Sequence, residues 1–381
     1  MKLTYYAVIA ATLTAAMTPG AARAQDDRLS VHGSANIAYG KTDGLPYFGL
    51  NQDGTSDYRA VALQFGYKVS DNDRVVTQLL HRKFGTSPLG AITPDIEPIW
   101  AFYEHRFDNG VSVKAGRNPL PRGLFNEVRF IGTLLPFYRV GNAVYGETLE
   151  NIDGVVVRKP FQLGSGWSLD SYVFGGGYDL KAQIPTSTGN SVIKIRNENS
   201  IGAQLWLNLP VKGVRVGTFL QSYKSTPSAD LPEDQRPNRT LTALYSAEGV
   251  FAKAFVRGEL TTFDATGNSY VKFKSYYAQA GVTPTEQLTF AVEYDGGTNN
   301  ISFAPAPIPN LDLPLNKELA LGVTYKPSAS VAFKLEGHKV EGYSFDRPVP
   351  SVIPPTAPPL VAKLAPASKG YFGLLSVAFS F

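Results

Sequence analysis

The sequence predicts an all-β protein, a 16-stranded antiparallel transmembrane β-barrel with a long inward-folded third loop. Short segments of alternating apolar and polar residues recur along the chain, and a wall between lipid and water requires this period-two pattern. Short polar turns alternate with long loops rich in proline and glycine. The chain opens with an export signal and contains no cysteine, which excludes a disulfide framework and a thiolate metal site.

Residues 1–24 are expected to be a secretory signal peptide. Lys2 precedes a mostly apolar run from Leu3 to Met17, and residues 22–24 supply the small side chains that a signal peptidase reads. Cleavage after Ala24 leaves residues 25–381 as one barrel domain. Loss of Lys2 and Arg23 lowers the formal net charge from +4 to +2, a near balance that gives no case for binding nucleic acid.

The last nine residues form the clearest strand. Large apolar side chains at Leu375, Val377, Phe379 and Phe381 alternate with small ones at 376, 378 and 380. Such a strand has one face in lipid and one face toward a polar interior. Residues 25–381 contain no apolar run of about 18, so the sequence offers no transmembrane helix.

The same alternation places sixteen strands along the chain, an even number as in single-chain bacterial barrels. We expect them at residues 29–40, 57–69, 74–85, 97–107, 110–118, 151–160, 166–177, 198–208, 213–224, 239–250, 253–263, 271–283, 288–296, 315–326, 331–344 and 369–381. The turn near residues 250–253 is the weakest of these boundaries.

The connections sort into two kinds that alternate along the chain. Short polar turns lie at 70–73, 108–109, 161–165, 209–212, 284–287 and 327–330. Long loops lie at 41–56, 86–96, 119–150, 178–197, 225–238, 297–314 and 345–368. In a meander barrel this alternation puts all turns at one rim and all loops at the other, as expected for periplasmic turns and outward loops.

The loop at residues 119–150 is long, lacks a strand pattern and carries many large apolar residues, including Leu120, Phe125 and Phe130. Connections of this length tend to be functional. Its apolar side chains would be poorly placed in outside water, so we expect the loop to fold against the inner wall. Its arginines would then project into the opening. The predicted pore constriction is formed by Arg117, Arg122, Glu127, Arg129 and Arg139.

Strand parity also places charges on the inner wall. The basic positions are Arg82, Arg106, Lys114 and Arg158, and the acidic ones are Glu259, Glu293, Asp295, Glu318 and Glu336. A basic side facing an acidic side would create a transverse field that sorts solutes by charge. Alternatively, these side chains pair with their neighbours and only keep the interior polar.

No catalytic chemistry is indicated by the sequence. The four histidines lie outside any Gly-x-Ser-x-Gly, HExxH or metal-ligand spacing. We therefore expect no enzyme, no cofactor and no metal site.

The sixteen-strand pattern, the longest loop after the fifth strand and the terminal Phe381 resemble the Gram-negative outer-membrane porin superfamily. Residues 116–127 are similar to a segment of uncharacterised porin-like proteins, an uncharacterised branch of that superfamily. They lack the acidic Pro-Glu-Phe-Gly-type tip of general enterobacterial porins, so the cation preference of that group does not carry over. The resemblance implies the outer membrane of a Gram-negative bacterium, contact with lipid and lipopolysaccharide, and a homotrimer.

These features together predict a passive diffusion channel for small hydrophilic solutes or ions, with a modest anion preference set by the loop arginines. A substrate-specific channel for a sugar, phosphate or organic anion is the first alternative. Its stacking surfaces would come from Trp100, Phe137, Tyr138 and Trp206. The second alternative is a non-channel outer-membrane barrel or a barrel enzyme.

Overall fold

The computed structural model describes residues 28–381 except 147–148, 187–188, 227–236, 268–269, 303–310, 344, 347–350, 353–362 and 365–366. The predicted signal peptide lies outside the described residues. Among the described helices, none is long and apolar enough to cross a membrane.

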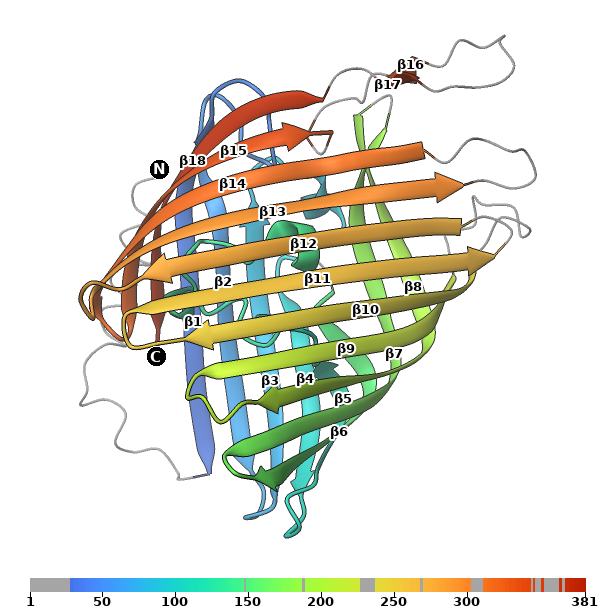
Figure 1. The fold of residues 1–381 in the computed structure, drawn as a ribbon, viewed down its shortest axis with the longest axis vertical. Coiled ribbons are helices and arrows are strands. Elements are labelled where there is room, and N and C mark those ends of the chain that lie inside the picture. The colour runs from blue at the N-terminus through green and yellow to red at the C-terminus, as the bar shows by residue number, and fades with distance from the viewer. Residues whose placement is uncertain are drawn as a thin grey trace.

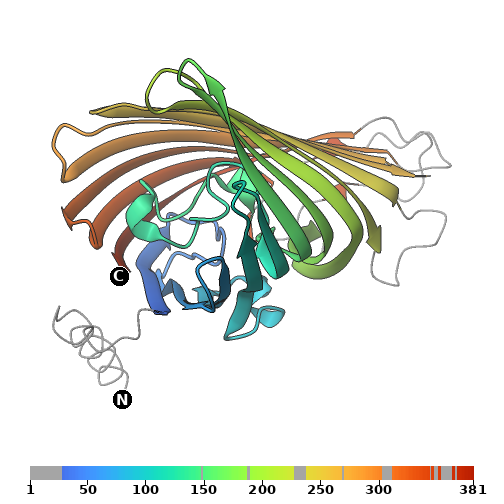
Figure 2. The same ribbon diagram turned by 90° about the horizontal axis from the view of Figure 1, so that it is seen from below.

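Sixteen strands form one closed antiparallel barrel, which confirms the predicted fold class (Figures 1 and 2). Each strand pairs with its sequence neighbours, and β1 closes the barrel against β18. The barrel strands are β1 (Leu29–Thr42), β2 (Thr55–Lys68), β3 (Asp73–Phe84), β4 (Glu97–Arg106), β5 (Ser112–Pro119), β6 (Asn151–Gly164), β7 (Trp167–Thr186), β8 (Gly189–Asn208), β9 (Val214–Thr226), β10 (Pro237–Val250), β11 (Ala254–Gly267), β12 (Tyr270–Val282), β13 (Leu288–Ser302), β14 (Leu311–Ser328), β15 (Val331–Gly342) and β18 (Ser368–Ser380). Two short strands, β16 (Ser351–Val352) and β17 (Lys363–Leu364), pair within the last loop.

Every predicted strand has its counterpart, but two hairpins are longer than predicted. Strands β7 and β8 extend through most of the predicted loop 178–197, and β13 and β14 extend into 297–314. In the first hairpin, Asp179 and Lys181 fall on positions that continue the outer face of β7. A lipid-facing strand does not tolerate this arrangement, so alternation alone did not predict strand there. The weak turn near 250 is real, because the amide of Phe251 donates to the carbonyl of Ala254 at 2.8 Å.

The two faces of the wall differ as the alternation predicted. On β15, the side chain of Leu335 points outward and is 62% exposed, whereas Lys334 and Glu336 point inward and are buried. Leu335 pairs with Leu375 on β18, so the apolar outer face continues across the seam. The apolar outer face and polar inner face are the reverse of a soluble protein, and they fit a barrel placed in lipid.

The connection between β5 and β6 folds into the barrel, as predicted. This constriction loop, residues 119–150, contains the short helices η2 (Gly132–Leu134) and α2 (Asn142–Tyr145), and its path lies behind β11 to β13 in Figure 1. Its base is closed by the amide of Leu120, which donates to the carbonyl of Glu150 at 3.0 Å. Gly123 has a φ of +62°, and a side chain there would meet Glu259 at 2.5 Å. Glycine is therefore required where the loop touches the wall.

The outer face gives a depth-dependent prediction. Leu335→Arg should lower the free energy of unfolding from lipid vesicles by about 2–4 kcal/mol, since arginine is costly near the bilayer midplane. Val331→Arg is the matched control, because it lies on the same face of β15 at the turn rim and should cost about 0–1 kcal/mol. Denaturant titration in vesicles measures both. Equal losses would show that this face does not meet a membrane interior.

Candidate functional site

Carboxylates of the inner wall hold the constriction loop by its backbone. The amide of Leu124 donates to Glu259 on β11 at 2.9 Å, and the amide of Ala143 donates to Asp295 on β13 at 3.3 Å. The amide of Tyr138 donates to Glu336 on β15 at 2.6 Å. Charge-assisted bonds of this kind are roughly twice as strong as neutral ones. The predicted acidic side of the wall is therefore the surface on which the loop is mounted.

The loop carbonyls are satisfied by other wall strands. Lys334 Nζ donates to the carbonyl of Phe137 at 2.7 Å, and Thr324 Oγ1 donates to that of Pro136 at 2.9 Å. On β1, which only β18 separates from β15, Asn36 Nδ2 donates to the carbonyl of Tyr138 at 3.0 Å and Ser34 Oγ to that of Phe130 at 3.0 Å. The polar anchors of the loop thus extend along the wall from β1 to β11. Buried backbone groups need such partners when no secondary structure supplies them.

Apolar packing fills much of the interior around the loop. Its largest cluster joins loop residues to inward side chains of β6, β7, β9, β10 and β12: Leu120, Phe125, Leu135, Val140, Val144, Tyr145, Ile152, Val156, Phe174, Phe219, Leu244 and Tyr277. Smaller clusters place Tyr138 against β1 and β2, Phe137 against β13 and β14, and Phe130 against β2 to β4. The loop is a packed element of the core, stabilised by burial of the side chains that predicted its inward fold.

Glu259 is the centre of the polar contacts on this side. Besides the amide of Leu124, its carboxylate accepts hydrogen bonds from the hydroxyls of Tyr277 at 2.8 Å, Tyr145 at 2.5 Å and Ser246 at 2.5 Å. Burial, and then the neighbouring Glu259 carboxylate, raise the pKa of the Tyr145 hydroxyl well above its ordinary value. Tyr145 therefore stays a neutral donor to Glu259 at physiological pH.

Arg122 does not project into an opening, which corrects that part of the prediction. Its side chain is 3% exposed, donates to the carbonyl of Val144 at 2.8 Å, and lies with its guanidinium carbon 5.4 Å from the Tyr145 ring centre. Burial lowers the pKa of the Arg122 guanidinium from its ordinary value, although Tyr145 and Glu259 oppose this shift. Arg122 holds the two limbs of the loop together.

Arg129 and Arg139 lie closer to open space. Arg129 is buried, donates to the carbonyl of Gly146 and lies 4.0 Å from the Glu150 carboxylate. The guanidinium carbon of Arg139 lies 4.6 Å from the ring centre of Phe48 and 5.0 Å from those of Tyr58 and Phe84. These distances are within the range of cation–π attraction. The aromatic side chains fix Arg139 in place.

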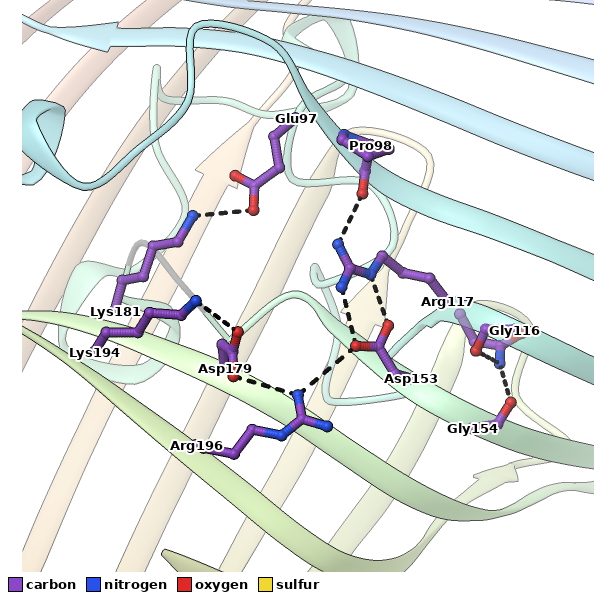
Figure 3. A network of polar contacts seen from close by, with 11 residues as sticks. Glu97, Pro98, Gly116, Arg117, Asp153, Gly154, Asp179, Lys181, Lys194 and Arg196 are labelled. Carbon is purple, nitrogen blue, oxygen red and sulfur yellow. Dashed lines mark hydrogen bonds and ion pairs between the residues drawn. The ribbon is translucent and has the colours of Figure 1, made fainter. Parts of the chain in front are cut away.

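Arg117 lies on the outside of the wall rather than in the predicted constriction. It pairs in register with Ala101 and Asp153, positions that share the outward face with Val155. Its guanidinium forms a bidentate ion pair with Asp153, with N–O distances of 2.6 and 2.9 Å (Figure 3). Parity along β5 dictates this orientation, because Arg117 follows Val113 and Ala115 at intervals of two.

The outer ion pairs continue from Arg117 across the wall. Arg196 on β8 reaches Asp153 at 3.9 Å and Asp179 at 3.3 Å, and Lys194 reaches Asp179 at 3.0 Å. Lys181 on β7 contacts Glu97 on β4 at 3.0 Å. This contact spans the loop ends of β5 and β6, which lie between β4 and β7, and it belongs to the inner side, because Glu97 also lies 3.4 Å from the buried Arg82.

The predicted basic wall is largely neutralised by pairing. Arg82 contacts Glu150 and lies 3.4 Å from Glu97, Arg106 lies 3.4 Å from Glu104, and Arg158 lies 2.8 Å from Asp170. Lys114 differs, because no carboxylate among the described residues lies within ion-pair distance. Its Nζ instead lies 5.2 Å from the ring centre of Phe102.

On the acidic side, Glu293 accepts from Gln279 at 2.6 Å and Glu318 accepts from the Tyr47 hydroxyl at 2.9 Å. The ring of His338 lies between Glu318, at 2.7 Å, and Glu336, at 3.2 Å. Sequence reasoning did not predict this role for His338. Its inward parity beside two acidic strands was the available signal.

Four cavities follow one another inside the barrel, the first three along β1 to β5 and the last toward β13 to β15. The first, of about 340 Å³, lies at the turn rim and shares His32, Gln64, Arg74 and Val76 with the second. The second, about 500 Å³, is called the vestibule; it lies between the loop and β1 to β5. Its lining comprises His32, Gly33, Ser34, Ala62, Gln64, Arg74, Val76, Gln78, Trp100, Phe102, Lys114, Pro119, Glu127, Val128, Phe130, Ile131, Ser380 and Phe381.

Beyond the vestibule the row of cavities narrows. Phe130 separates the vestibule from a cavity of about 30 Å³ that is lined by Arg129, Arg139, Asn36 and Ala60. Arg139 also lines the next cavity, again about 30 Å³, which faces Glu293, Asp295, Glu318 and Glu336. Each of these two cavities, together the narrow segment, has room for about two water molecules. Inward residues of β1 and β2 along this row are short, such as Ser34, Ala60 and Ala62.

Among the residues that the structure describes, no group of three or more His, Asp or Glu side chains is arranged to hold a metal ion.

Of the predicted constriction residues, Arg129 and Arg139 flank the narrow segment and Glu127 lines the vestibule. Arg122 is buried within the loop, and Arg117 lies on the outer face of the wall.

No protein-family model and no curated protein sequence matches this chain. Solved structures do match. OmpF of Salmonella typhi in complex with daunomycin has a TM-score of 0.60 and 13% identity, covering 93% of this chain and 97% of that chain. The outer-membrane channel DcaP of Acinetobacter baumannii has a TM-score of 0.57, 11% identity and the same coverage. An anion-selective porin from Comamonas acidovorans has a TM-score of 0.54 and 12% identity, covering 93% and 99%.

The fold and the inward loop thus define a porin-type barrel. The chain has the sixteen-stranded fold of Gram-negative outer-membrane porins, as its sequence pattern predicted.

The carboxylate contacts predict how firmly the loop is held. Glu336→Gln should speed hydrogen exchange at the amide of Tyr138 by about ten- to a hundred-fold, because a hydrogen bond to a charged group contributes about 1.5–3 kcal/mol. Exchange of the detergent-solubilised protein, followed by mass spectrometry, measures this change. The control is Glu341→Gln, whose carboxylate contacts exposed Lys369 and should leave loop exchange unchanged. Unaltered exchange in Glu336→Gln would mean that packing alone holds the loop.

Proposed function

We propose that the protein is a passive channel of the outer membrane for small hydrophilic solutes, with a modest anion preference. The observation that supports this most is the row of cavities that runs from the turn rim to the narrow segment flanked by Arg129 and Arg139. Guanidinium groups at the narrowest point favour anions, because field lines concentrate in a narrow opening. The similar structures that include a channel and an anion-selective porin are consistent with this function.

The acidic groups limit that preference. Glu293, Asp295, Glu318 and Glu336 line the cavity on the far side of Arg139. His338 and the loop amides satisfy part of their charge, but an anion leaving Arg139 still meets carboxylates. The balance of the two signs supports a modest selectivity instead of a strict one.

A substrate-specific channel is the second candidate function. The narrow segment has room only for water-sized species, so a larger solute needs the side chains around Arg139 to move. A solute that makes favourable contacts there would pass in preference to others. Block of the ion current by individual solutes distinguishes this candidate from a general pore.

Several further properties belong to the same proposal. Residues 1–24 direct export and are removed, the barrel contacts lipid and lipopolysaccharide through its apolar outer face, and three copies assemble in the outer membrane. The assembly is implied by the resemblance to porins. The protein transports without catalysis and without a cofactor.

Substitution of Arg139 gives the first functional prediction. Planar-bilayer recording of the wild type under a salt gradient should give a reversal potential on the anion side. Arg139→Gln should move that potential toward the cation side, since the neighbouring carboxylates then dominate the field. Arg117→Gln, on the outer face, should leave it unchanged. Cation selectivity of the wild type would reject the anion preference, and absence of conductance would reject the channel.

Cysteine substitution gives the second, because the chain contains no native thiol. In Ala62→Cys and Ala60→Cys, a sulfonate-bearing methanethiosulfonate added to the bath should reduce the ion current, since both positions line the cavities. Ala320→Cys is the matched control, because Ala320 also faces inward but is packed beneath Phe137. Its current should persist under the same treatment. Equal sensitivity of all three positions would place the path elsewhere.

A further inference from the structure

The vestibule has the size and lining of a ligand site. At about 500 Å³ it falls within the range of small-molecule pockets, which are mostly apolar with a few polar groups that fix orientation. Its walls combine the rings of Trp100, Phe102 and Phe130 with the ammonium group of Lys114. We propose that the vestibule binds aromatic monocarboxylates and that these form a preferred solute class of the channel. This proposal rests on the proposed function and deepens it.

The rings that line the vestibule come from two different elements. Trp100 and Phe102 alternate on the inward face of β4, where Trp100 pairs with Gln78 and Phe102 with Gly116. Phe130 comes from the constriction loop and packs with Trp100 against Leu80 and Ile99. All three rings line the vestibule, so a planar ring that enters this cavity meets the wall on one side and the loop on the other. Offset or edge-to-face contacts between aromatic rings contribute beyond simple burial.

Lys114 is the cation best placed to receive a carboxylate. The one arginine that lines the vestibule, Arg74, is already engaged by Glu104. Lys114 has its Nζ 5.2 Å from the Phe102 ring centre, and no described carboxylate forms an ion pair with it. A bound carboxylate would therefore gain a charge-assisted hydrogen bond without displacing an existing partner. Its ring would lie over the same aromatic surface that Lys114 contacts.

The remaining charges set the number of negative groups that the site accepts. Arg82 and Arg129 lie with their guanidinium carbons 5.9 and 5.6 Å from the ring centre of Phe130, but both lie beside the carboxylate of Glu150 and so add little net positive charge to the vestibule. Glu127, on the loop, also lines the vestibule. Its carboxylate repels a second negative charge on the ligand. The arrangement therefore favours a monocarboxylate over a dicarboxylate of the same size.

Trp100 provides a direct readout. The chain has three tryptophans, so Trp167→Phe with Trp206→Phe leaves Trp100 as the only one. In this background, in detergent, benzoate should change the Trp100 emission saturably. Benzamide, which keeps the ring but lacks the charge, should bind about tenfold more weakly. Phthalate, which carries a second carboxylate, should also bind more weakly than benzoate.

Substitutions assign each charge to its role. Lys114→Gln should reduce benzoate affinity to that of benzamide and leave benzamide binding unchanged, whereas Lys114→Arg should retain most of the preference. Glu127→Gln should bring phthalate affinity closer to that of benzoate. The matched control is Lys212→Gln, in a turn at the same rim but outside the vestibule lining, which should change none of the affinities.

The outcomes separate the site from the channel. Equal affinities for benzoate and benzamide would overturn the proposal, and so would benzoate binding that Lys114→Gln leaves unaltered. If Lys114→Gln fails to fold, the Lys114→Arg and Glu127→Gln comparisons still decide between the outcomes. A chain that conducts ions but does not bind benzoate keeps the proposed function and rejects the site. A chain that binds benzoate but does not conduct keeps the binding site and rejects both the channel and the transport of these ligands.

Discussion

The structure depends on how the backbone of the constriction loop is satisfied inside the barrel. Residues 119–150 lack the continuous ladder that a strand offers, yet they lie where water is largely excluded by packed side chains. Unpaired backbone groups in such a place are costly. Glu259, Asp295 and Glu336 meet this need by accepting from loop amides, while Lys334, Thr324 and Asn36 donate to loop carbonyls. These anchors fix the path of the loop backbone at residues 124, 136–138 and 143.

Because the wall charges hold the loop, they contribute less to the electric field across the lumen. A carboxylate that accepts two or more hydrogen bonds has much of its charge compensated locally, and the same holds for an arginine paired with a glutamate. Glu259 and Arg82 are therefore weak sources of a field across the lumen. Arg139 is surrounded by aromatic rings and lines a cavity that also faces Glu293, Asp295, Glu318 and Glu336. Under the proposed function, selectivity would depend on the charges that line this narrow segment.

Much of this organisation could be predicted from the sequence, because it follows from local periodicity. Alternation at Leu375 to Phe381 identifies a wall strand, and the apolar content around Phe125 and Phe130 requires an inward loop. What periodicity does not contain is the partner of each charged residue. Arg122 bonds to Val144, which lies 22 positions away within an irregular segment, and no sequence pattern encodes that contact.

Arg117 is a different case, since parity counted from Val113 would have placed it on the outer face. The loop chemistry that begins two residues later obscured this simple signal. For His338, the sequence predicts the face of the strand but not the partners of the side chain. Its inward position on β15 was readable from alternation, but its place between Glu318 and Glu336 depends on the register of two strands.

The outer network around Arg117 affects how the barrel meets the bilayer. Arg117, Asp153, Asp179 and Arg196 occupy outward positions that elsewhere on the wall carry apolar side chains. Hydrocarbon chains solvate such groups poorly, so on β5 to β8 the apolar part of the outer face ends below these residues. In the proposed outer-membrane setting, the network would lie at the level of the lipid headgroups, where charged groups stay hydrated. The position of these four residues would then mark how deep β5 to β8 sit in the membrane.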